Sequence, residues 1–373
     1  MLGARKHRVL HLGKFYPPHM GGIEVYLQNL VARQSGVMDV DVLVANDRRR
    51  TDFDVLDGAR ICRVGSLGML ASMPITPTMG WHLRRHETDL IHFHTPNPGG
   101  ALAILGSGYK GKIVITHHSD TLGREYLKWM SDRFVLRVME RASRIIVTSE
   151  RYLASSKELH PFRHKCVVIP LGLEMERFEN PDEMAVSRIK AEYGDRIIIA
   201  VGRLVPFKGF EYLIRAMKNV TGILLLIGAG PQRDFLQECI LECGVENRVH
   251  LIGNVDNALI PPYYRAASVF VMPSITRAES FGIVQLEAMA SGISVVNTDI
   301  PSGVPEVSVH GVTGITVSPK DPEALSNAIN LLLRDVALRQ RFGRAARERV
   351  RNGFSAERMV EQTIKLYRSV INE

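Results

Sequence analysis

Short apolar runs alternate with helical patterns along almost the whole chain of 373 residues. The apolar runs have the length of buried strands, and the segments between them repeat apolar residues at helical spacing. This alternation predicts parallel sheets made of strand–helix–strand units, and hence an α/β fold. The strands predicted in the first half are Val9–Leu12, Asp41–Val44, Arg60–Val64, Leu90–Phe93, Ile113–Thr116, Ile145–Thr148 and Val167–Pro170. Those predicted in the second half are Ile197–Val201, Ile223–Ile227, Val249–Leu251, Val269–Met272, Ser294–Asn297 and Ile315–Val317.

Each half starts with a strand and a glycine-containing loop, which predicts two similar doubly wound domains. The length of the chain also exceeds that of a usual single core. The apolar alternation stops near Gly172–Met184, so the predicted domains are 1–175 and 176–354. Residues 355–373 form a predicted capped amphipathic helix. Doubly wound sheets bind ligands beyond the carboxyl ends of their strands, so the loops that follow the strands are the candidate sites.

One such loop follows Val269–Met272 and leads to two carboxylates eight residues apart, Glu279 and Glu287. Glu279 falls in the strand-to-helix loop and Glu287 inside the next helix. The first turn of a helix leaves backbone N–H groups unpaired, and these donors favour an anion such as phosphate. The donors in question belong to Ser280, Phe281, Gly282, Ile283 and Val284. The alternative is a solvated acidic pair at a helix start, where carboxylates are common.

A second loop follows Ile197–Val201 and reads Gly-Arg-Leu-Val-Pro-Phe-Lys-Gly. Its two cations are Arg203 and Lys208, and a diphosphate can bridge them. Arginine offers a planar fork for phosphate oxygens, whereas lysine offers a mobile point charge. A basic loop taken alone can equally be ordinary surface.

Together the two loops resemble the E-x7-E and G-R-x4-K-G elements of retaining glycosyltransferases of family 4. The resemblance implies the GT-B fold, with two Rossmann-like domains that face a cleft and a final helix that crosses back to the N-terminal domain. It also implies that Arg203 and Lys208 stabilise the departing nucleotide diphosphate, that Glu279 binds the sugar hydroxyls, and that Glu287 binds the ribose. With these groups stabilising the leaving diphosphate, neither a metal ion nor a cofactor is expected.

Further segments extend the resemblance over nearly the whole chain, in the order of the family. Gly21 and Gly22 lie in a stretch similar to the P-x-x-G-G-x-E loop, where glycines let a backbone approach a ligand closely. Gly230 lies in a G-x-G-P turn that lines the nucleotide pocket of the family. Val255 follows the strand Val249–Leu251, where the family holds the base mainly through backbone groups. The segment Pro301–Glu306 resembles the late G-x-P-E element and is expected to support the Glu279 loop.

Histidines gather at two strand ends of the first half. The T-x-H-S/T pattern of the family selects His118 as the residue that touches the donor sugar, and Asp120 is expected to orient groups or to meet the acceptor. A metal site or a buried pair is the alternative for His117 and His118, but neighbouring side chains of a strand point to opposite faces. His92 and His94 share one face, so zinc is conceivable there, although we expect a cleft wall or acceptor contacts.

Two Asp-x-Asp triplets invite comparison with metal-dependent transferases, which hold a divalent ion with such a triplet. They are Asp39–Asp41 and Asp52–Asp54, around the second strand and a following loop. Both lie far along the chain from every phosphate element. We therefore expect turn and surface carboxylates, and no metal. Four scattered cysteines likewise favour neither a disulfide framework nor a zinc site.

The net charge of +8 lies entirely in the N-terminal half, where residues 1–175 hold 24 Lys and Arg against 16 Asp and Glu. The segment from Arg124 to Arg141 reads as an amphipathic helix, with Arg133, Arg137, Arg141 and Arg144 interleaved with Trp129, Phe134, Leu136 and Val138. Such a face can lie on an anionic membrane, or it can simply be solvated. No nucleic-acid-binding module is recognised. No apolar run is long enough to span a bilayer, and the start has no signal-peptide core, so a cytoplasmic protein is expected.

The sequence thus predicts an enzyme that moves a hexose from a sugar nucleotide to a hydroxyl of a glycan or lipid-linked acceptor in polysaccharide or lipopolysaccharide biosynthesis. GDP-mannose is the first donor considered and a UDP-hexose the second. Contact with the inner face of the cytoplasmic membrane fits such an acceptor. The rivals are a GT-B-fold epimerase or phosphorylase and a non-catalytic sugar-nucleotide-binding protein.

Overall fold

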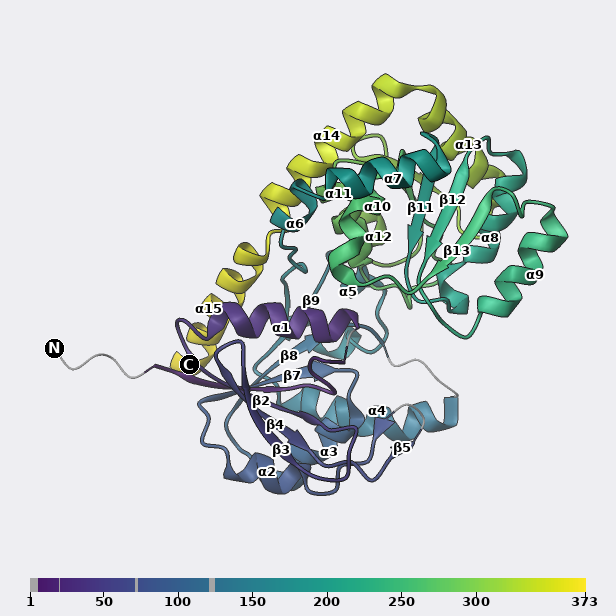
Figure 1. The fold of residues 1–373 in the computed structure, drawn as a ribbon. Helices are drawn as coiled ribbons and strands as arrows, with labels where there is room; N and C mark the ends of the chain where they lie inside the picture. Colours follow the sequence, from purple (N-terminus) through teal and green to yellow (C-terminus); the bar gives the residue numbers. More distant parts are fainter. Residues whose placement is uncertain (1–5, 20, 71–72, 121–124) are drawn as a thin grey trace. The chain divides into compact units, whose positions relative to one another are not determined.

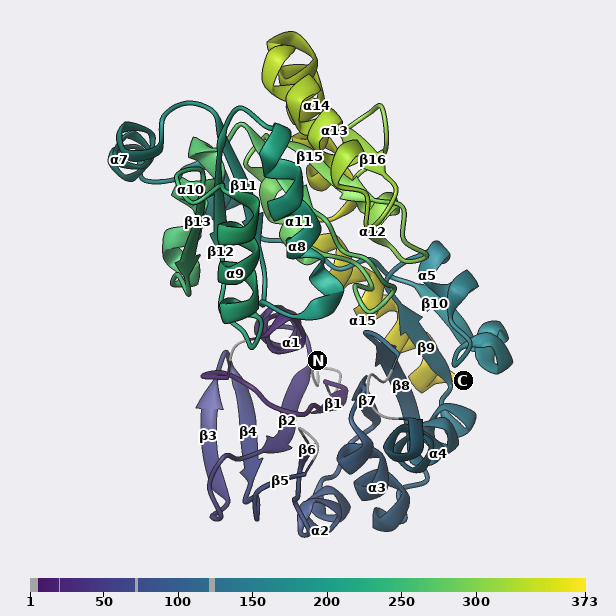
Figure 2. The ribbon, with the colours of Figure 1, turned by 90° about the vertical axis from the view of Figure 1, so that its right-hand side faces the viewer.

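The computed structural model describes residues 6–19, 21–70, 73–120 and 125–373, with the side chains of 125–132 outside that description. The chain forms two compact units, which can be followed in Figures 1 and 2. Unit 1 comprises Met1–Gly172 and Ala356–Glu373, and unit 2 comprises Leu173–Ser355. The first unit thus ends at Gly172, against residue 175 in the sequence-based prediction.

An eight-stranded sheet forms the centre of unit 1. Its strands are β1 (Arg8–Leu12), β2 (Asp39–Ala45), β3 (Asp52–Leu56), β4 (Ala59–Val64), β7 (Leu90–Thr95), β8 (Lys112–His117), β9 (Arg144–Val147) and β10 (Cys166–Val168). Their order is β10-β9-β8-β7-β1-β2-β4-β3, and all neighbours are parallel except β3 and β4. The short strands β5 (Met69–Leu70) and β6 (Met73–Pro74) pair separately.

Helices cover both faces of this sheet. They are α1 (Gly22–Gln34), α2 (Met79–Arg85), α3 (Pro98–Ser107), α4 (Glu125–Arg141), α5 (Glu150–Ser155), the 3-10 helix η1 (His160–Lys165) and α15 (Ala356–Asn372). Helices α2, α3 and α4 contribute to one core with alternate strand residues such as Leu10, Ile91 and Ile115. The intervening residues point to the other face, where α1 and α15 pack. The last helix therefore belongs to the N-terminal unit, as the predicted fold requires.

Unit 2 contains a six-stranded sheet with only parallel neighbours. Its strands are β11 (Ile197–Val201), β12 (Ile223–Ile227), β13 (Val249–Gly253), β14 (Val269–Met272), β15 (Ser294–Thr298) and β16 (Gly314–Val317). The order β13-β12-β11-β14-β15-β16 is that of a doubly wound Rossmann sheet. Its first strand, β11, therefore lies beside its fourth, β14, and the direction of winding reverses between them.

Unit 2 has helices on both faces of its sheet as well. They are α6 (Glu176–Glu179), α7 (Glu183–Tyr193), η2 (Pro206–Lys208), α8 (Phe210–Ala216), η3 (Met217–Asn219), α9 (Arg233–Cys243), η4 (Asn257–Leu259), α10 (Ile260–Ala266), α11 (Ile283–Ala290), α12 (Val304–Val307), α13 (Pro322–Arg334) and α14 (Val336–Gly353). Helices α8, α9 and α13 pack together over one face, and α10 with α7 and α11 lies on the other (Figure 2). Each predicted strand is present in the structure.

Two predictions about the Asp-x-Asp triplets are corrected. Asp52 and Asp54 do not lie in a loop, because Asp52–Leu56 forms an edge strand that pairs with β4. Asp41 is not a surface carboxylate but is 2% exposed and accepts two hydrogen bonds from Arg60, at 2.6 and 2.9 Å. Although burial works the other way, hydrogen bonds from His86 and Arg60 lower the pKa of Asp41. Neither triplet belongs to a group of three possible metal ligands within the described residues.

The predicted basic helix also needs a correction. Arg133, Arg137 and Arg141 are exposed on α4, but Arg144 begins the strand β9 and forms an ion pair with Glu373 at 2.6 Å. The apolar residues Phe134, Leu136 and Val138 pack against the core of unit 1, so they are not available to enter a membrane. Arg124 and the side chain of Trp129 lie outside the described part of the chain. No helix in the described residues is long and apolar enough to cross a bilayer.

Candidate active site

The candidate site in unit 2 lies at the carboxyl ends of β11 and β14, the point where the winding of the sheet reverses. Glycines bring the loops after these strands close together. A Cβ atom on Gly209, after β11, would lie 2.3 Å from the carbonyl oxygen of Pro273, after β14. Gly209 also has a φ of 67°, which only glycine adopts readily. Any larger residue here would push the two loops apart.

Lys208 and Glu279 meet where these two loops approach each other. The Nζ atom of Lys208 lies 2.5 Å from Oε2 of Glu279, and both side chains are largely buried, with exposures of 12% and 11%. Ser274 donates a further hydrogen bond to the same carboxylate oxygen at 3.5 Å. Gly202 leaves room for the lysine, since a Cβ there would lie 3.2 Å from Nζ. The sequence-predicted lysine and glutamate are thus brought together, although their direct ion pair was not predicted.

The N-terminus of α11 adjoins this pair. Gly282 precedes the helix with a φ of 74° and has no side chain to cap the first turn, which leaves backbone donors of that turn without an intrahelical partner. The loop that precedes α11 is held in place by residues that follow β15, because the backbone N–H of Gly303 donates to the carbonyl of Ser280 at 2.8 Å. Gln285 adds a hydrogen bond to the carbonyl of Val304 at 3.3 Å. The expected support of the Glu279 loop by residues 301–306 is therefore present.

Glu287 lies one to two turns into α11 and has a protein partner. The hydroxyl of Tyr264 donates to its Oε2 at 2.8 Å. Burial raises the pKa of Glu287, and the hydrogen bond from Tyr264 opposes that rise. Its other carboxylate oxygen, Oε1, has no hydrogen-bond partner among the described residues. Tyr264 was not predicted, and its place on α10, far from the motif in sequence, explains why.

The remaining predicted residues of unit 2 occupy loops after neighbouring strands. Arg203 is exposed after β11, and its guanidinium has no ion pair or hydrogen bond among the described residues. Gly230 follows β12 and packs on the β11 loop, where a Cβ would lie 2.4 Å from the carbonyl oxygen of Leu204. Val255 is half-buried after β13, just before Asp256 caps η4. All three residues therefore lie on the same edge of the sheet as Lys208.

In unit 1, Gly21 and Gly22 are exposed at the start of α1. Gly21 makes no side-chain cap, and a Cβ there would lie 2.5 Å from Oε2 of Glu24. A side chain at Gly21 would therefore displace the Glu24 side chain at the N-terminus of α1.

His118 follows β8 and points to the face of the sheet that α1 covers. It is 6% exposed, its ring meets Tyr26 edge-on with centroids 4.9 Å apart, and its Nε2 lies 3.4 Å from Nδ1 of His94. His117 points the other way, toward Thr95 and Asp120. The adjacent imidazoles therefore do not share a ligand, as strand geometry predicted.

Asp120 acts within the protein as an orienting group. Its Oδ1 atom accepts hydrogen bonds from Tyr152 and Ser156, both at 2.8 Å, and lies 3.2 Å from Nε2 of His117. Burial alone would raise the pKa of Asp120, but His117 and the two hydroxyls lower it. A contact between Asp120 and an acceptor stays a prediction.

Sequence reasoning missed the buried partners of these histidines. His11 of β1 and Gln34 of α1 are both fully buried, and His92 contacts Tyr367 of α15. His92 is itself 0% exposed, so it is neither a cleft wall nor an acceptor contact. His11, His92 and His94 lie close enough for a metal ion, but each of their six ring nitrogens already has a hydrogen-bond partner. A histidine inside the apolar run Val9–Leu12 was the available signal.

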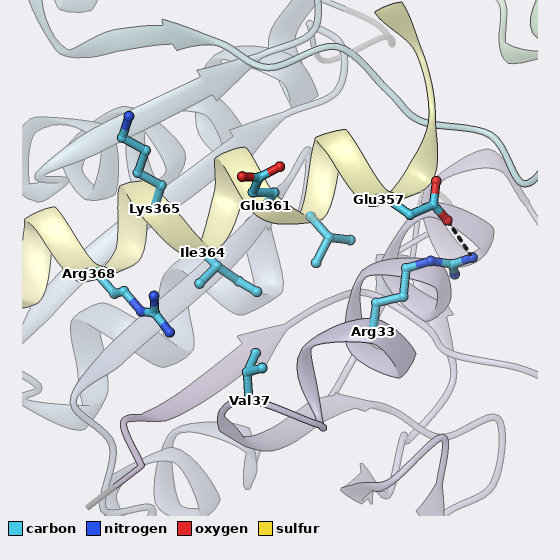
Figure 3. Close-up of a pocket in the computed structure, with 8 residues that line it drawn as sticks. Arg33, Val37, Glu357, Glu361, Ile364, Lys365 and Arg368 are labelled. Atoms are coloured by element: carbon cyan, nitrogen blue, oxygen red, sulfur yellow. Dashed lines mark hydrogen bonds and ion pairs between the residues drawn. The ribbon is translucent and has the colours of Figure 1, made fainter. Parts of the chain in front are cut away.

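Three cavities of the described structure lie apart from the predicted site residues. A groove of about 610 Å³ lies between α1 and α15 (Figure 3). Arg33 and Glu357 close one end of it with an ion pair of 3.5 Å. Two more cavities of about 880 and 500 Å³ lie beside α7 and between α2 and α3. None of the three contains a predicted site residue, so the candidate site rests on its side chains and backbone donors.

Comparison with known families gives matches to both halves of the chain. A model described as Glycosyltransferase Family 4 matches residues 20–177, and one described as Glycosyl transferases group 1 matches residues 184–349. An uncharacterized glycosyltransferase of Methanocaldococcus jannaschii is 35% identical over 381 residues, covering 95% of this chain and 96% of that protein.

Two relatives that are named as mannosyltransferases are similar over most of their length. The O-antigen chain mannosyltransferase C of Escherichia coli is 26% identical and covers 98% of this chain and 99% of the relative. The GDP-mannose-dependent alpha-(1-6)-phosphatidylinositol monomannoside mannosyltransferase of Mycolicibacterium smegmatis is 29% identical, with coverage of 89% and 91%.

Solved structures support the GT-B fold. The sucrose-phosphate synthase of Thermosynechococcus elongatus has a TM-score of 0.84 at 24% identity, covering 98% of this chain and all of its own. HepE of Anabaena in complex with UDP has a TM-score of 0.79 at 22% identity, with coverage of 97% and 100%.

Proposed function

This chain belongs to the glycosyltransferases of family 4, and on that basis we propose that it moves a hexose from a nucleotide diphosphate sugar to an acceptor hydroxyl, with retention of configuration and without a metal ion. One observation carries the proposal. At the reversal point of the unit 2 sheet, an ammonium group lies 2.5 Å from a carboxylate, beside the open N-terminus of α11. Cations and helix donors suit a diphosphate, while the carboxylate suits sugar hydroxyls.

The proposed reaction breaks the bond between the anomeric carbon and the phosphate oxygen of the donor. The acceptor oxygen forms its bond to the same face of that carbon, and its proton passes to the leaving phosphate oxygen. Negative charge that develops on the diphosphate is stabilised by Arg203, Lys208 and the N–H groups of residues 282–284. Glu279 accepts hydrogen bonds from the sugar, Glu287 from the ribose, and His118 supports the sugar.

For the donor we propose GDP-mannose first and a UDP-hexose second. The relatives of Escherichia coli and Mycolicibacterium smegmatis, which bear the name mannosyltransferase, support the first, and the UDP complex of HepE supports the second. By their names, these two mannosyltransferases act on an O-antigen chain and on a phosphatidylinositol mannoside. We therefore propose a glycan or lipid-linked acceptor in polysaccharide or lipopolysaccharide biosynthesis.

Product analysis tests this function. The enzyme is incubated with GDP-mannose or UDP-glucose and a membrane lipid extract in EDTA, and the configuration of the new linkage is read by NMR. We expect an α-linked product from the α-linked donor, at the same rate with and without chelator. Inverted configuration, or activity that returns only with added magnesium or manganese, would contradict the mechanism. An epimerised nucleotide sugar, a sugar phosphate, or unchanged donor would point instead to an epimerase, a phosphorylase or a binding protein.

We further propose that the enzyme works in the cytoplasm at the inner face of the membrane and meets anionic lipid through the exposed cations of α4. The apolar side chains of this helix pack against the core of unit 1, so the proposed contact with lipid is electrostatic. Each basic residue near such a surface is worth about 1 kcal/mol.

A double substitution tests the membrane contact. Arg133→Gln with Arg137→Gln should weaken binding to vesicles of anionic phospholipid by roughly tenfold or more, since two such charges are lost. The matched control is Arg188→Gln with Lys218→Gln, which removes two exposed cations of unit 2. Equal vesicle binding by both variants would show that the α4 cations are only solvated.

A further inference from the structure

Four side chains form a single file of hydrogen bonds across unit 1. Oε1 of Gln34, at the end of α1, lies 2.8 Å from Nε2 of His11. Nδ1 of His11 lies 3.1 Å from Nε2 of His94, and Nδ1 of His94 lies 3.4 Å from Nε2 of His118. The rings of His11, His94 and His118 stack in turn, at interplanar angles of 21° and 22°. The file therefore links a buried amide to the histidine assigned to the sugar.

The imidazoles of this file are neutral at physiological pH. Burial lowers the pKa of His11 to about 4, that of His118 to about 3, and that of His94 well below its usual value. A neutral imidazole has one N–H donor and one lone pair. Consequently, the hydrogen bond made by one ring nitrogen fixes what the other nitrogen can do.

The amide oxygen is the Gln34 atom that faces His11, while the buried amide Nε2 of Gln34 has no hydrogen-bond partner among the described residues. In this orientation the amide oxygen sets the direction of the whole file, because it can only accept. Nε2 of His11 must then carry the proton, and Nδ1 of His11 accepts from Nε2–H of His94. By the same logic Nδ1 of His94 accepts from Nε2–H of His118. The proton of His118 is thereby committed to Nε2, and Nδ1 is left with its lone pair.

Nδ1 of His118 is the open end of the file. It has no hydrogen-bond partner among the described residues, and it is not one of the buried polar atoms that lack a partner, so part of it reaches solvent. We propose that Gln34 is a positioning residue that sets the tautomer of His118 through His11 and His94, so that Nδ1 meets a sugar hydroxyl as an acceptor. The identity of that ligand rests on the proposed function, whereas the tautomer does not.

The tautomer can be read directly in the wild-type enzyme. NMR of ¹⁵N-histidine-labelled protein distinguishes protonated from unprotonated ring nitrogens, and the His118→Asn variant assigns the signals of His118 by their loss. We expect Nδ1 of His118 to be unprotonated and Nε2 protonated at neutral pH, with no ligand present. A protonated Nδ1, or a mixture of the two tautomers, would overturn the proposal.

Substitution of Gln34 tests the causal step. Gln34→Met removes the acceptor, and a buried N–H without a partner is rarer than an unpaired acceptor. The file should therefore reverse, protonate Nδ1 of His118, and lower kcat/KM for the sugar nucleotide about tenfold, as for one lost hydrogen bond. The control Thr116→Val removes buried hydrogen bonds to His92 and to Tyr26 on the same face but replaces no member of the file. It should keep the His118 tautomer and stay within about twofold of wild type in kcat/KM.

The experiments distinguish a wrong role for Gln34 from a wrong function of the enzyme. If both variants change kcat/KM alike and neither changes the tautomer, Gln34 is only a packing residue and the proposal is wrong. If the wild-type tautomer is as expected but no sugar nucleotide reacts, the proposed function fails and the control of His118 by Gln34 stands.

Discussion

Replacing Lys208 with alanine should lower the turnover of the nucleotide sugar by roughly a hundredfold or more, as for other preorganised groups that stabilise developing charge. The ammonium of Lys208 is also the partner of Glu279 at 2.5 Å. Its removal therefore leaves a largely buried carboxylate unpaired beside the proposed phosphate site, where the carboxylate repels the donor. We expect a lower melting temperature of unit 2 together with the loss of turnover.

Arg203→Ala should separate these two effects. The Arg203 guanidinium is exposed and makes no ion pair among the described residues. Turnover should again fall about a hundredfold, while the melting temperature should stay that of wild type. Lys218→Ala, which removes an exposed cation of η3, is the control and should change neither quantity.

The double variant Lys208→Met with Glu279→Gln tests whether the loss of stability in Lys208→Ala comes from the unpaired carboxylate of Glu279. It removes both charges of the pair, so it should recover stability relative to Lys208→Ala. Turnover should remain low, because the cation for the diphosphate is still missing and the carboxylate assigned to the sugar is replaced as well. Turnover near that of wild type in Lys208→Ala or in this double variant would remove Lys208 from the mechanism.

Unit 1 should lose much of its stability between pH 7 and pH 5. Burial lowers the pKa values of His11, His92, His94 and His118. In the unfolded chain these imidazoles take up protons below about pH 6.5, whereas the folded unit keeps them neutral at pH 5. The unfolded state thus binds more protons, so the free energy of unfolding falls as the pH falls. His11 and His118 each cost about 2 kcal/mol at pH 5, and His92 and His94 add to the loss in the same direction.

Hydrogen exchange at pH 7 and pH 5 measures this loss in each unit separately. After correction for the intrinsic exchange rate, protection of the strands β1, β7 and β8 should drop steeply. Unit 2 is the internal reference, because none of the four histidines belongs to it. The lowered pKa values of Asp41 and Asp120 affect the free energy of unfolding only below about pH 4, where these carboxylates take up protons in the unfolded chain. Equal protection of unit 1 at both pH values would mean that the histidines are already charged in the folded state.

Local patterns predicted the strands because a buried parallel strand leaves an uninterrupted apolar run. They failed where a strand is not buried on both faces. Asp52–Leu56 is an edge strand with an exposed middle, so its polar residues resembled a loop. Arg144 continued the helical spacing of α4, but Ala142 and Ser143 end the helix before it. Helical spacing alone does not mark where a helix stops.

Contacts between distant segments were beyond sequence reasoning for a different reason. Lys208 and Glu279 were each recognised by motif, yet their ion pair depends on the neighbouring positions of β11 and β14, which the order of strands along the chain does not reveal. His11 was missed because a histidine in an apolar strand carries no motif. Its partners Gln34 and His94 come from other elements, and only the folded sheet brings the three together.

The proposed function requires that the β11 and β14 loops of unit 2 bind a nucleotide diphosphate sugar without metal. A thermal-shift titration with a panel of sugar nucleotides, including GDP-mannose and UDP-glucose, in EDTA tests it most directly. Ligand at a hundred times its Kd stabilises a protein by about 2.7 kcal/mol, so the wild type should melt at a higher temperature with the true donor. The variant Arg203→Ala with Lys208→Ala should show no such rise. No rise with any sugar nucleotide, a rise only after a divalent ion is added, or the same rise in that variant would contradict the account.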